Sequence, residues 1–282
     1  MNLKETALTL KVINPYNPTF ITHLNYIKCF NKISKNLNLE CKRLDKSTKK
    51  TDKRLLSKVS LIKLIKKSLD GEFKACKENN DFAEVFSIWI PVKSYYLIFN
   101  MLLVLNYLIS PENNKGFNIS HKSLITKTKE LIGKSELIFN KSYFNHLYAH
   151  QEVKDVKFDP GENLKEEQDV QKLTKCLIKK LVSYKIEEFK RSKKINSLRK
   201  KKDRLKVENY LSKEFTNLFE LFYLFRIKTN YRDLDFLEED VGSTQFYNYF
   251  ENYYLATMNF YEALKKSINN LSKKRFKKDL IK

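Results

Sequence analysis

Residues 95–109 read YYLIFNMLLVLNYLI, a run that is apolar except for Asn100 and Asn106. As a helix this run would extend over roughly 22 Å, which is shorter than the ~30 Å hydrocarbon core of a membrane. Pro91 and Lys93 precede the run and Pro111 follows it, so the apolar segment has little room to extend. We therefore expect a core helix that is buried on nearly all sides, and no membrane span.

The composition favours an all-α protein. The chain has 282 residues with only five Gly and five Pro, fewer than sandwiches, barrels or Rossmann-type sheets need for their tight turns. Hydrophobic residues make up 42% of the chain and aromatic residues 13%, which is enough for a large core. The four cysteines are far apart and form no CxxC pair, so we expect neither a zinc knuckle nor a disulfide framework.

The charge balance points to polyanions as partners. Lys and Arg total 55 and Asp and Glu total 33, so the formal net charge is +22. A field of this sign attracts nucleic acids and anionic surfaces. The sequence contains no P-loop, GxGxxG, GxSxG or paired-carboxylate pattern, which gives little weight to ATPases, dehydrogenases, serine hydrolases and glycosidases.

Apolar spacing predicts helices joined by polar segments. Ser120 is placed to cap one helix, Gly133 suits its end, and Asp159-Pro160-Gly161 is the clearest turn signal. Residues 8–13 alternate as in a short strand, and Pro91 either kinks a helix or marks a new start. The predicted helices cover 19–39, 55–77, 83–109, 121–132, 134–150, 166–210 as one or two helices, 211–231 and 244–271.

Three stretches carry a resemblance to a known superfamily. They are KSYYLIFN (93–100), HKSLI (121–125) and LFYLFRIKTNY (221–231). In this order and spacing they resemble the HEPN superfamily, and in particular its small prokaryotic members of the toxin and defence type. Those members carry a Tyr-Tyr helix, a following His turn and an Arg motif on a later helix. A closing helix rich in Ala and aromatic residues matches residues 253–264.

The resemblance implies an all-α, HEPN-like helical bundle made of residues 55–145 and 207–272. Residues 1–54 would be an N-terminal extension with a basic linker, residues 146–206 a long, charged helical insertion, and residues 273–282 a basic tail. The resemblance further implies RNA as the usual substrate or partner, and a bundle that often forms homodimers.

The resemblance also implies a catalytic motif, which here is degenerate. Many HEPN members are metal-independent ribonucleases whose Arg binds the scissile phosphate and whose His moves a proton. Arg226 matches the Arg, but Tyr231 stands where the His is expected, and Asn230 lies one helical turn after Arg226. His121 matches the turn histidine, as an auxiliary group or as a structural residue at the helix start. Alternatively, Arg226 forms a structural ion pair with Asp233 or Asp235 while Tyr231 packs in the core.

Residues 190–206 contain ten basic residues and one acid, Asp203. With Ile195, Leu198 and Leu205 at roughly helical intervals, the segment is predicted to be a basic amphipathic helix. Three interpretations of this helix are open: a face exposed only to solvent, a site for the RNA backbone, or a contact with an anionic membrane surface. The expected RNA-binding residues are Lys190, Arg191, Lys193, Lys194, Arg199, Lys200, Lys201, Lys202, Arg204 and Lys228.

His146 and His150 are four residues apart, so a helix would place both rings on one face. With Glu152 they form a weak metal-site pattern, and we predict ordinary surface or packing histidines, with no metal and no cofactor. We expect the aromatic residues between Phe246 and Tyr261 to be core residues; the alternative is that they are stacking platforms for single-stranded nucleic acid.

These patterns together predict a cytoplasmic, RNA-binding HEPN-like protein. The hypothesis includes metal-independent endoribonuclease activity on tRNA or mRNA in a toxin–antitoxin or phage-defence system, with Arg226, Asn230 and Tyr231 as the catalytic set. The alternative is a non-catalytic HEPN interaction module that binds a cognate partner protein such as a nucleotidyltransferase.

Overall fold

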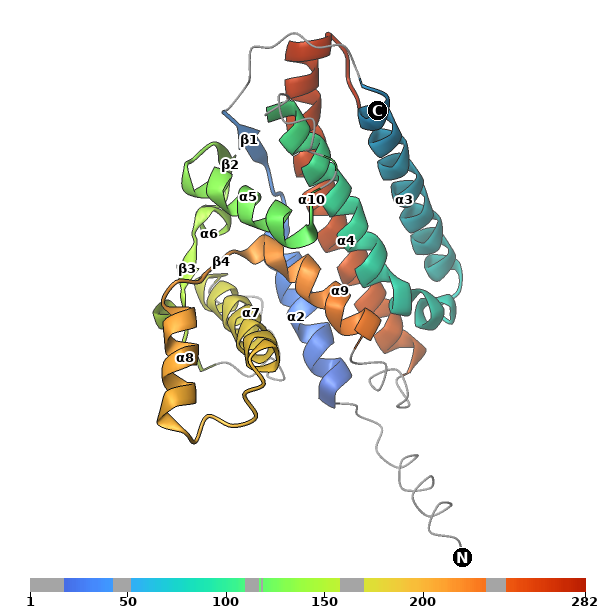
Figure 1. Ribbon diagram of the computed structural model, residues 1–282. Coiled ribbons are helices and arrows are strands. Elements are labelled where there is room, and N and C mark those ends of the chain that lie inside the picture. The colour runs from blue at the N-terminus through green and yellow to red at the C-terminus, as the bar shows by residue number, and fades with distance from the viewer. Residues whose placement is uncertain (1–17, 43–51, 110–116, 118, 158–169, 232–241) are drawn as a thin grey trace, which may run out of the picture.

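Two long parallel helices form the centre of the all-α fold in the computed structural model (Figure 1). α4 (Phe82–Ile109) packs along α10 (Ser243–Phe276), α3 (Lys53–Glu78) covers α4, and α2 (Pro18–Ser34) covers α10. The structure describes residues 18–42, 52–109, 117, 119–157, 170–231 and 242–282. The predicted strand 8–13, the turn 159–161, most of the basic linker, Asp233 and Asp235 lie outside the described residues.

A second layer lies against this centre. α9 (Leu221–Tyr231) packs on α4, α7 (Val170–Ser192) packs on α2 and α9, and α8 (Lys201–Leu211) packs on α7. α5 (His121–Gly133) contacts α4 (Figure 1). These helices bring the three motif stretches, which lie on α4, α5 and α9, into one region of the molecule.

Polar side chains fix two helix starts, of which the sequence predicts the second. The Asp52 carboxylate accepts a hydrogen bond from the Arg54 backbone N–H at 2.9 Å and starts α3. The Ser120 hydroxyl accepts from the Ser123 N–H at 3.1 Å and starts α5. Each bond satisfies a backbone donor that the first helical turn leaves without a partner.

The apolar run 95–109 is buried in the bundle, as expected. Tyr96, Phe99 and Leu102 are its partly buried residues, and the rest of the run is buried. α4 continues through Pro91 as one helix of 28 residues, so the alternative of a new start at Pro91 is wrong. Among the described helices, α4 is also the one long and apolar enough to span a membrane by length and composition, and 61% of its most apolar window is buried inside the protein.

Aromatic residues fill the core between α2, α9 and α10. The Phe30 ring lies 5.4 Å from the Phe260 ring, and Phe222 meets Phe260 edge-to-face at 5.1 Å. Phe246, Tyr249, Phe250, Tyr253, Phe260 and Tyr261 are all buried, which confirms the core interpretation of the aromatic residues on α10.

The expected helix over 134–150 is wrong. After Ser135, which adopts φ 54°, the chain forms β2 (Leu137–Phe139), the short α6 (Ser142–Asn145), β3 (Tyr148–Ala149) and the 3₁₀ turn η1 (His150–Glu152). β2 pairs antiparallel with β1 (Leu39–Cys41), with Glu40 opposite Ile138. The Asn145 side chain bonds both the N–H and the C=O of Phe139, at 2.7 and 2.8 Å, and so replaces helical bonds in this segment.

The expected helix over 211–231 begins late, at Leu221. Residues before it form β4 (Phe215–Thr216), which pairs with β3, and the 3₁₀ turn η2 (Leu218–Glu220). Asn217 is buried and directs this change, because its side-chain N–H groups donate to the carbonyls of Phe144 and His146 while its Oδ1 accepts from the Phe219 N–H.

Candidate functional site

The three motif stretches meet around Arg226. Its Nη2 donates to the Tyr96 hydroxyl at 3.2 Å, and the guanidinium carbon lies 5.1 Å from the Tyr95 ring centroid and 5.2 Å from that of Tyr96. The Tyr95 hydroxyl contacts His121 Nδ1 at 2.6 Å. We call Tyr95, Tyr96, His121 and Arg226 the Arg226 cluster.

Helix geometry explains why these side chains converge. Tyr95 and Phe99 are one turn apart on α4 and face the first residue of α5, with the Phe99 ring 4.3 Å and the Tyr95 ring 5.4 Å from the His121 ring. The Ser120 cap fixes where α5 starts and therefore where His121 projects. α9 crosses α4 at this level and supplies Arg226.

The Arg226 guanidinium has donors without a partner among the described residues. Nε is buried and has no hydrogen-bond partner, and the one hydrogen bond of the side chain among the described residues goes to Tyr96. Within the same part of the chain no carboxylate lies within salt-bridge distance of it. A cation held between aromatic rings with free N–H groups is suited to binding an anion such as a phosphate.

The cluster shifts the titration of its members. The pKa of His121 is lowered from 6.5, first by burial and then by the positive charge of Arg226. Burial raises the pKa of the Tyr95 hydroxyl strongly, and the nearby Arg226 opposes this only in part. Near pH 7, His121 is therefore neutral and Tyr95 is protonated. When Nδ1 of His121 carries the proton, it donates to Tyr95 and leaves Nε2 as a proton acceptor.

The remaining members of the predicted catalytic set lie on the same helix. α9 includes Lys228, Asn230 and Tyr231, but the side chains of 227–231 lie outside the described part of the structure. The predicted ion pair between Arg226 and Asp233 or Asp235 also lies outside it. The motif stretches of Arg226 and His121 meet in the structure, whereas the bond from the guanidinium to Tyr96 was not predicted from the sequence.

The basic segment 190–206 is not one amphipathic helix. α7 ends at Ser192, Lys194 adopts φ 52°, and α8 begins at Lys201. The Ile195 N–H donates to the Lys190 carbonyl at 2.8 Å and the Lys194 N–H to the Arg191 carbonyl at 3.1 Å, which is the Schellman pattern of a helix end. Ile195 is buried and holds the chain away from the helix axis. The predicted RNA-binding residues of this segment are exposed, with one exception. Lys190 is half-buried and forms an ion pair with Glu187.

His146 and His150 do not share a helix face. His146 follows α6 and its Nε2 lies 2.7 Å from Glu152 Oε2, while His150 begins η1. Over the described ranges no group of three His, Cys, Asp or Glu side chains is arranged to hold a metal.

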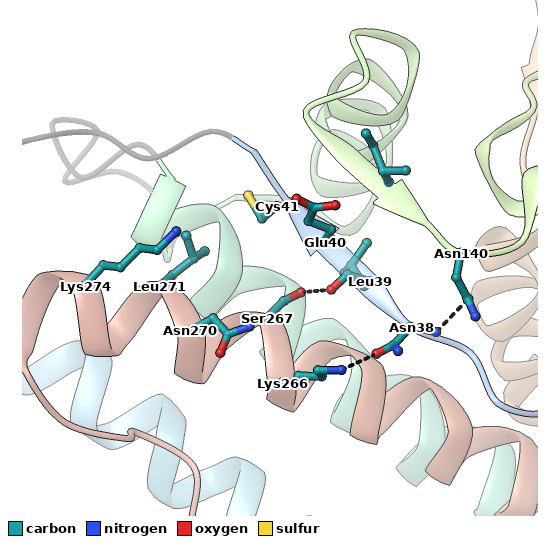
Figure 2. Close-up of a pocket in the computed structure, with 11 residues that line it drawn as sticks. Asn38, Leu39, Glu40, Cys41, Asn140, Lys266, Ser267, Asn270, Leu271 and Lys274 are labelled. Carbon is teal, nitrogen blue, oxygen red and sulfur yellow. Dashed lines mark hydrogen bonds between the residues drawn. The ribbon is translucent and has the colours of Figure 1, made fainter.

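A separate hollow of about 420 Å³ lies between β1 and the C-terminal half of α10 (Figure 2). Its polar groups pair with one another: Lys266 donates to Asn38 Oδ1 at 3.3 Å, the Asn38 N–H donates to Asn140 at 2.8 Å, and the Ser267 hydroxyl donates to the Leu39 carbonyl (Figure 2). These bonds tie α10 to the β1–β2 pair, so the groups that make them have a structural role.

Comparisons of the chain with protein family models, curated protein sequences and solved structures gave no match. The HEPN resemblance therefore rests on the three motif stretches and the closing helix of this sequence alone.

Proposed function

We propose that the protein is an RNA-binding, HEPN-like endoribonuclease that cleaves without a metal ion. Arg226 binds the scissile phosphate and His121 accepts the proton of the attacking 2′-hydroxyl. The observation that carries this proposal is the guanidinium of Arg226. It contacts Tyr95 and Tyr96, has donors without a partner among the described residues, and lies in the same cluster as a neutral histidine.

The reaction balances with these groups. The 2′-oxygen forms a bond to phosphorus while its proton moves to His121 Nε2, and the bond from phosphorus to the 5′-oxygen breaks. The leaving oxygen takes a proton from water, and the hydroxide that remains takes the proton from His121. The products are a 2′,3′-cyclic phosphate and a 5′-hydroxyl, and the enzyme returns to its starting state. Arg226 stabilises the charge that develops on the phosphoryl oxygens, for which a preorganised donor is effective.

His121 acts as the general base in place of Tyr231, the residue at the position of the family's histidine. A phenol with an ordinary pKa of ~10 is a poor base at pH 7. A histidine with a lowered pKa is mostly in its acceptor form at the same pH. Asn230, four residues after Arg226, would donate a hydrogen bond to the phosphate or a base, and RNA would reach the site along the exposed basic segment 190–206.

The biological setting follows from the resemblance. We place the protein in the cytoplasm, as a homodimer that acts on tRNA or mRNA in a toxin–antitoxin or phage-defence system.

One surface favours a second candidate function, a non-catalytic module that binds a partner protein such as a nucleotidyltransferase. Phe82, Val85 and Trp89 are 48%, 56% and 54% exposed and lie on one face of α4, at spacings of three and four residues. A stripe of exposed large apolar side chains is typical of protein interfaces.

A metal-free cleavage assay distinguishes the two candidates. Purified protein is incubated with labelled tRNA and mRNA in EDTA, beside His121→Gln, Arg226→Ala and Tyr231→His. Cleavage that is lost in the first two variants supports the endoribonuclease, and Tyr231→His is expected to raise it by restoring the acid–base group of the family. An intact fold with no cleavage by any of the four proteins supports the interaction module.

A further inference from the structure

A cavity of about 330 Å³ lies beside the Arg226 cluster, between α5, α7, α8 and α9. We call it the aromatic pocket, because Tyr184, Tyr210 and Tyr223 line it together with the apolar Leu181 and Leu224. This volume is near the lower end for ligand pockets, about 300–1,000 Å³, and suits one small planar group.

The pocket adjoins the candidate cleavage site. Lys122, which lines the pocket, directly follows His121 on α5, and the Tyr223 ring lies 5.8 Å from the Tyr95 ring. Tyr223 both lines the pocket and contacts the cluster; burial and then Glu188 raise the pKa of its hydroxyl, and Lys122 and Arg226 oppose this. A nucleotide whose phosphate contacts Arg226 would have its base within reach of the pocket.

The floor of the pocket is a buried charged group. Lys185 Nζ donates to the Phe215 carbonyl at 3.2 Å and to the Thr216 hydroxyl at 3.1 Å, and it forms an ion pair with Glu220 Oε2 at 2.9 Å. Lys129 Nζ donates to the Phe215 carbonyl at 3.0 Å and lies 3.6 Å from Glu220. Lys129 therefore keeps one donor for a ligand.

The mouth of the pocket carries two carboxylates, each about one-third exposed. Glu188 accepts a hydrogen bond from Lys122 at 2.8 Å. Glu214 lies 3.5 Å from Lys185 through Oε2, an ion pair without a hydrogen bond. Glu214 therefore has the greater capacity to accept hydrogen bonds from a ligand.

We propose that the aromatic pocket binds the guanine base of the nucleotide next to the scissile phosphate, an inference that rests on the proposed function. Guanine presents two parallel donors, N1–H and N2–H, which match one carboxylate, and its O6 accepts from a lysine such as Lys129. Adenine presents a ring acceptor where guanine has N1–H, so it cannot make the paired contact with Glu214. Tyrosine faces stack on either purine and add affinity without choosing between them.

Calorimetric titration with GMP, AMP and IMP tests this preference for guanine. All three nucleotides carry the same phosphate, so their electrostatic attraction to the basic protein cancels when their affinities are compared as ratios. A bidentate base contact predicts that GMP binds at least about tenfold more tightly than AMP, with IMP, which lacks the N2 amino group, in between. Equal affinities for GMP and AMP, or no binding of either, would overturn the proposal.

Two variants locate the site. Glu214→Gln is expected to reduce the ratio of GMP affinity to AMP affinity to below about threefold. Glu208 is an exposed residue of α8 that does not line the pocket, so the control variant Glu208→Gln should keep this ratio. Thr126→Trp, at an exposed lining position of α5, should block the pocket and abolish binding of both nucleotides, whereas Glu130→Trp on the same helix should not. A guanine preference that survives both Glu214→Gln and Thr126→Trp would place the site elsewhere.

Arg226→Ala separates this inference from the proposed function. The variant is expected to keep the GMP-to-AMP ratio, because Arg226 does not line the pocket. A guanine preference without RNA cleavage by the wild type would support the pocket and refute the ribonuclease. RNA cleavage by the wild type with no guanine preference, either in nucleotide binding or in the mapped cut sites, would support the ribonuclease and refute the guanine pocket.

Discussion

Replacing Arg226 by Ala removes one hydrogen bond to Tyr96 and one cation that lies over two aromatic rings. The hydrogen bond is worth about 1 kcal/mol and each ring contact about 0.5–1 kcal/mol at a partly exposed site. The free energy of unfolding should therefore fall by only about 1–3 kcal/mol. At roughly 2–4 °C per kcal/mol for a chain of this size, the melting temperature should fall by about 2–12 °C.

Cleavage should fall far more than stability does. Loss of one preorganised donor to a developing oxyanion lowers kcat by about 10²–10³-fold. Arg226→Lys keeps the charge but cannot bind two phosphate oxygens in a planar fork, so we expect an intermediate loss. Tyr96→Phe keeps the ring and removes only the hydroxyl that orients Nη2, so it should reduce cleavage less than Arg226→Ala.

The assay is a time course with labelled RNA in EDTA, with each variant checked by thermal unfolding in the same buffer. Arg226→Ala that cleaves within threefold of wild type would refute the role of the guanidinium. A variant that no longer unfolds cooperatively would show that Arg226 is mainly a structural residue, which is the ion-pair alternative.

Four further predictions follow from the described residues. Because burial and Arg226 lower the pKa of His121, metal-free cleavage should rise with pH through a midpoint below 6.5 and then level off, and a rate that rises only above pH 8 would indicate a tyrosine base. If about six charges of residues 190–206 neutralise phosphates of a single strand, log K should fall against log salt with a slope of roughly −4, and a flat titration would remove this segment from the RNA site. Lys194→Gly should stabilise the protein by about 0.5–1 kcal/mol in urea unfolding, because glycine adopts φ 52° without the side-chain clash, whereas Lys193→Gly should not. Light scattering should show a dimer at tens of micromolar, and a monomer there would argue against paired Arg226 sites at a two-fold interface.

The main helices could be predicted from the sequence because their signals are local. The apolar run of α4 and the Ser120 cap of α5 lie within the elements they define, and both were predicted. The errors have the opposite origin. The segment 134–150 is held by the pairing of β2 with β1 and by Asn145, and the late start of α9 depends on the buried bonds of Asn217 to residues of another segment. Such contacts join residues that are distant in the chain, so no local pattern predicts them.

The candidate site divides in the same way. Arg226 and His121 could be predicted from motif order, because rigid helices that pack in a bundle bring matching levels together. The aromatic pocket could not, since its floor exists only where the β3–β4 pairing positions the Phe215 carbonyl and Glu220 against lysines of α5 and α7. The ends of α7 and α5 could not be predicted either. Lys194 and Ser135 occupy left-handed positions that glycine usually takes. Buried or hydrogen-bonded neighbours therefore end these helices, and residue propensity does not. In a chain with five glycines, tertiary contacts must therefore supply the information that turn residues normally give, and the sequence is least informative at the loops that shape the pocket.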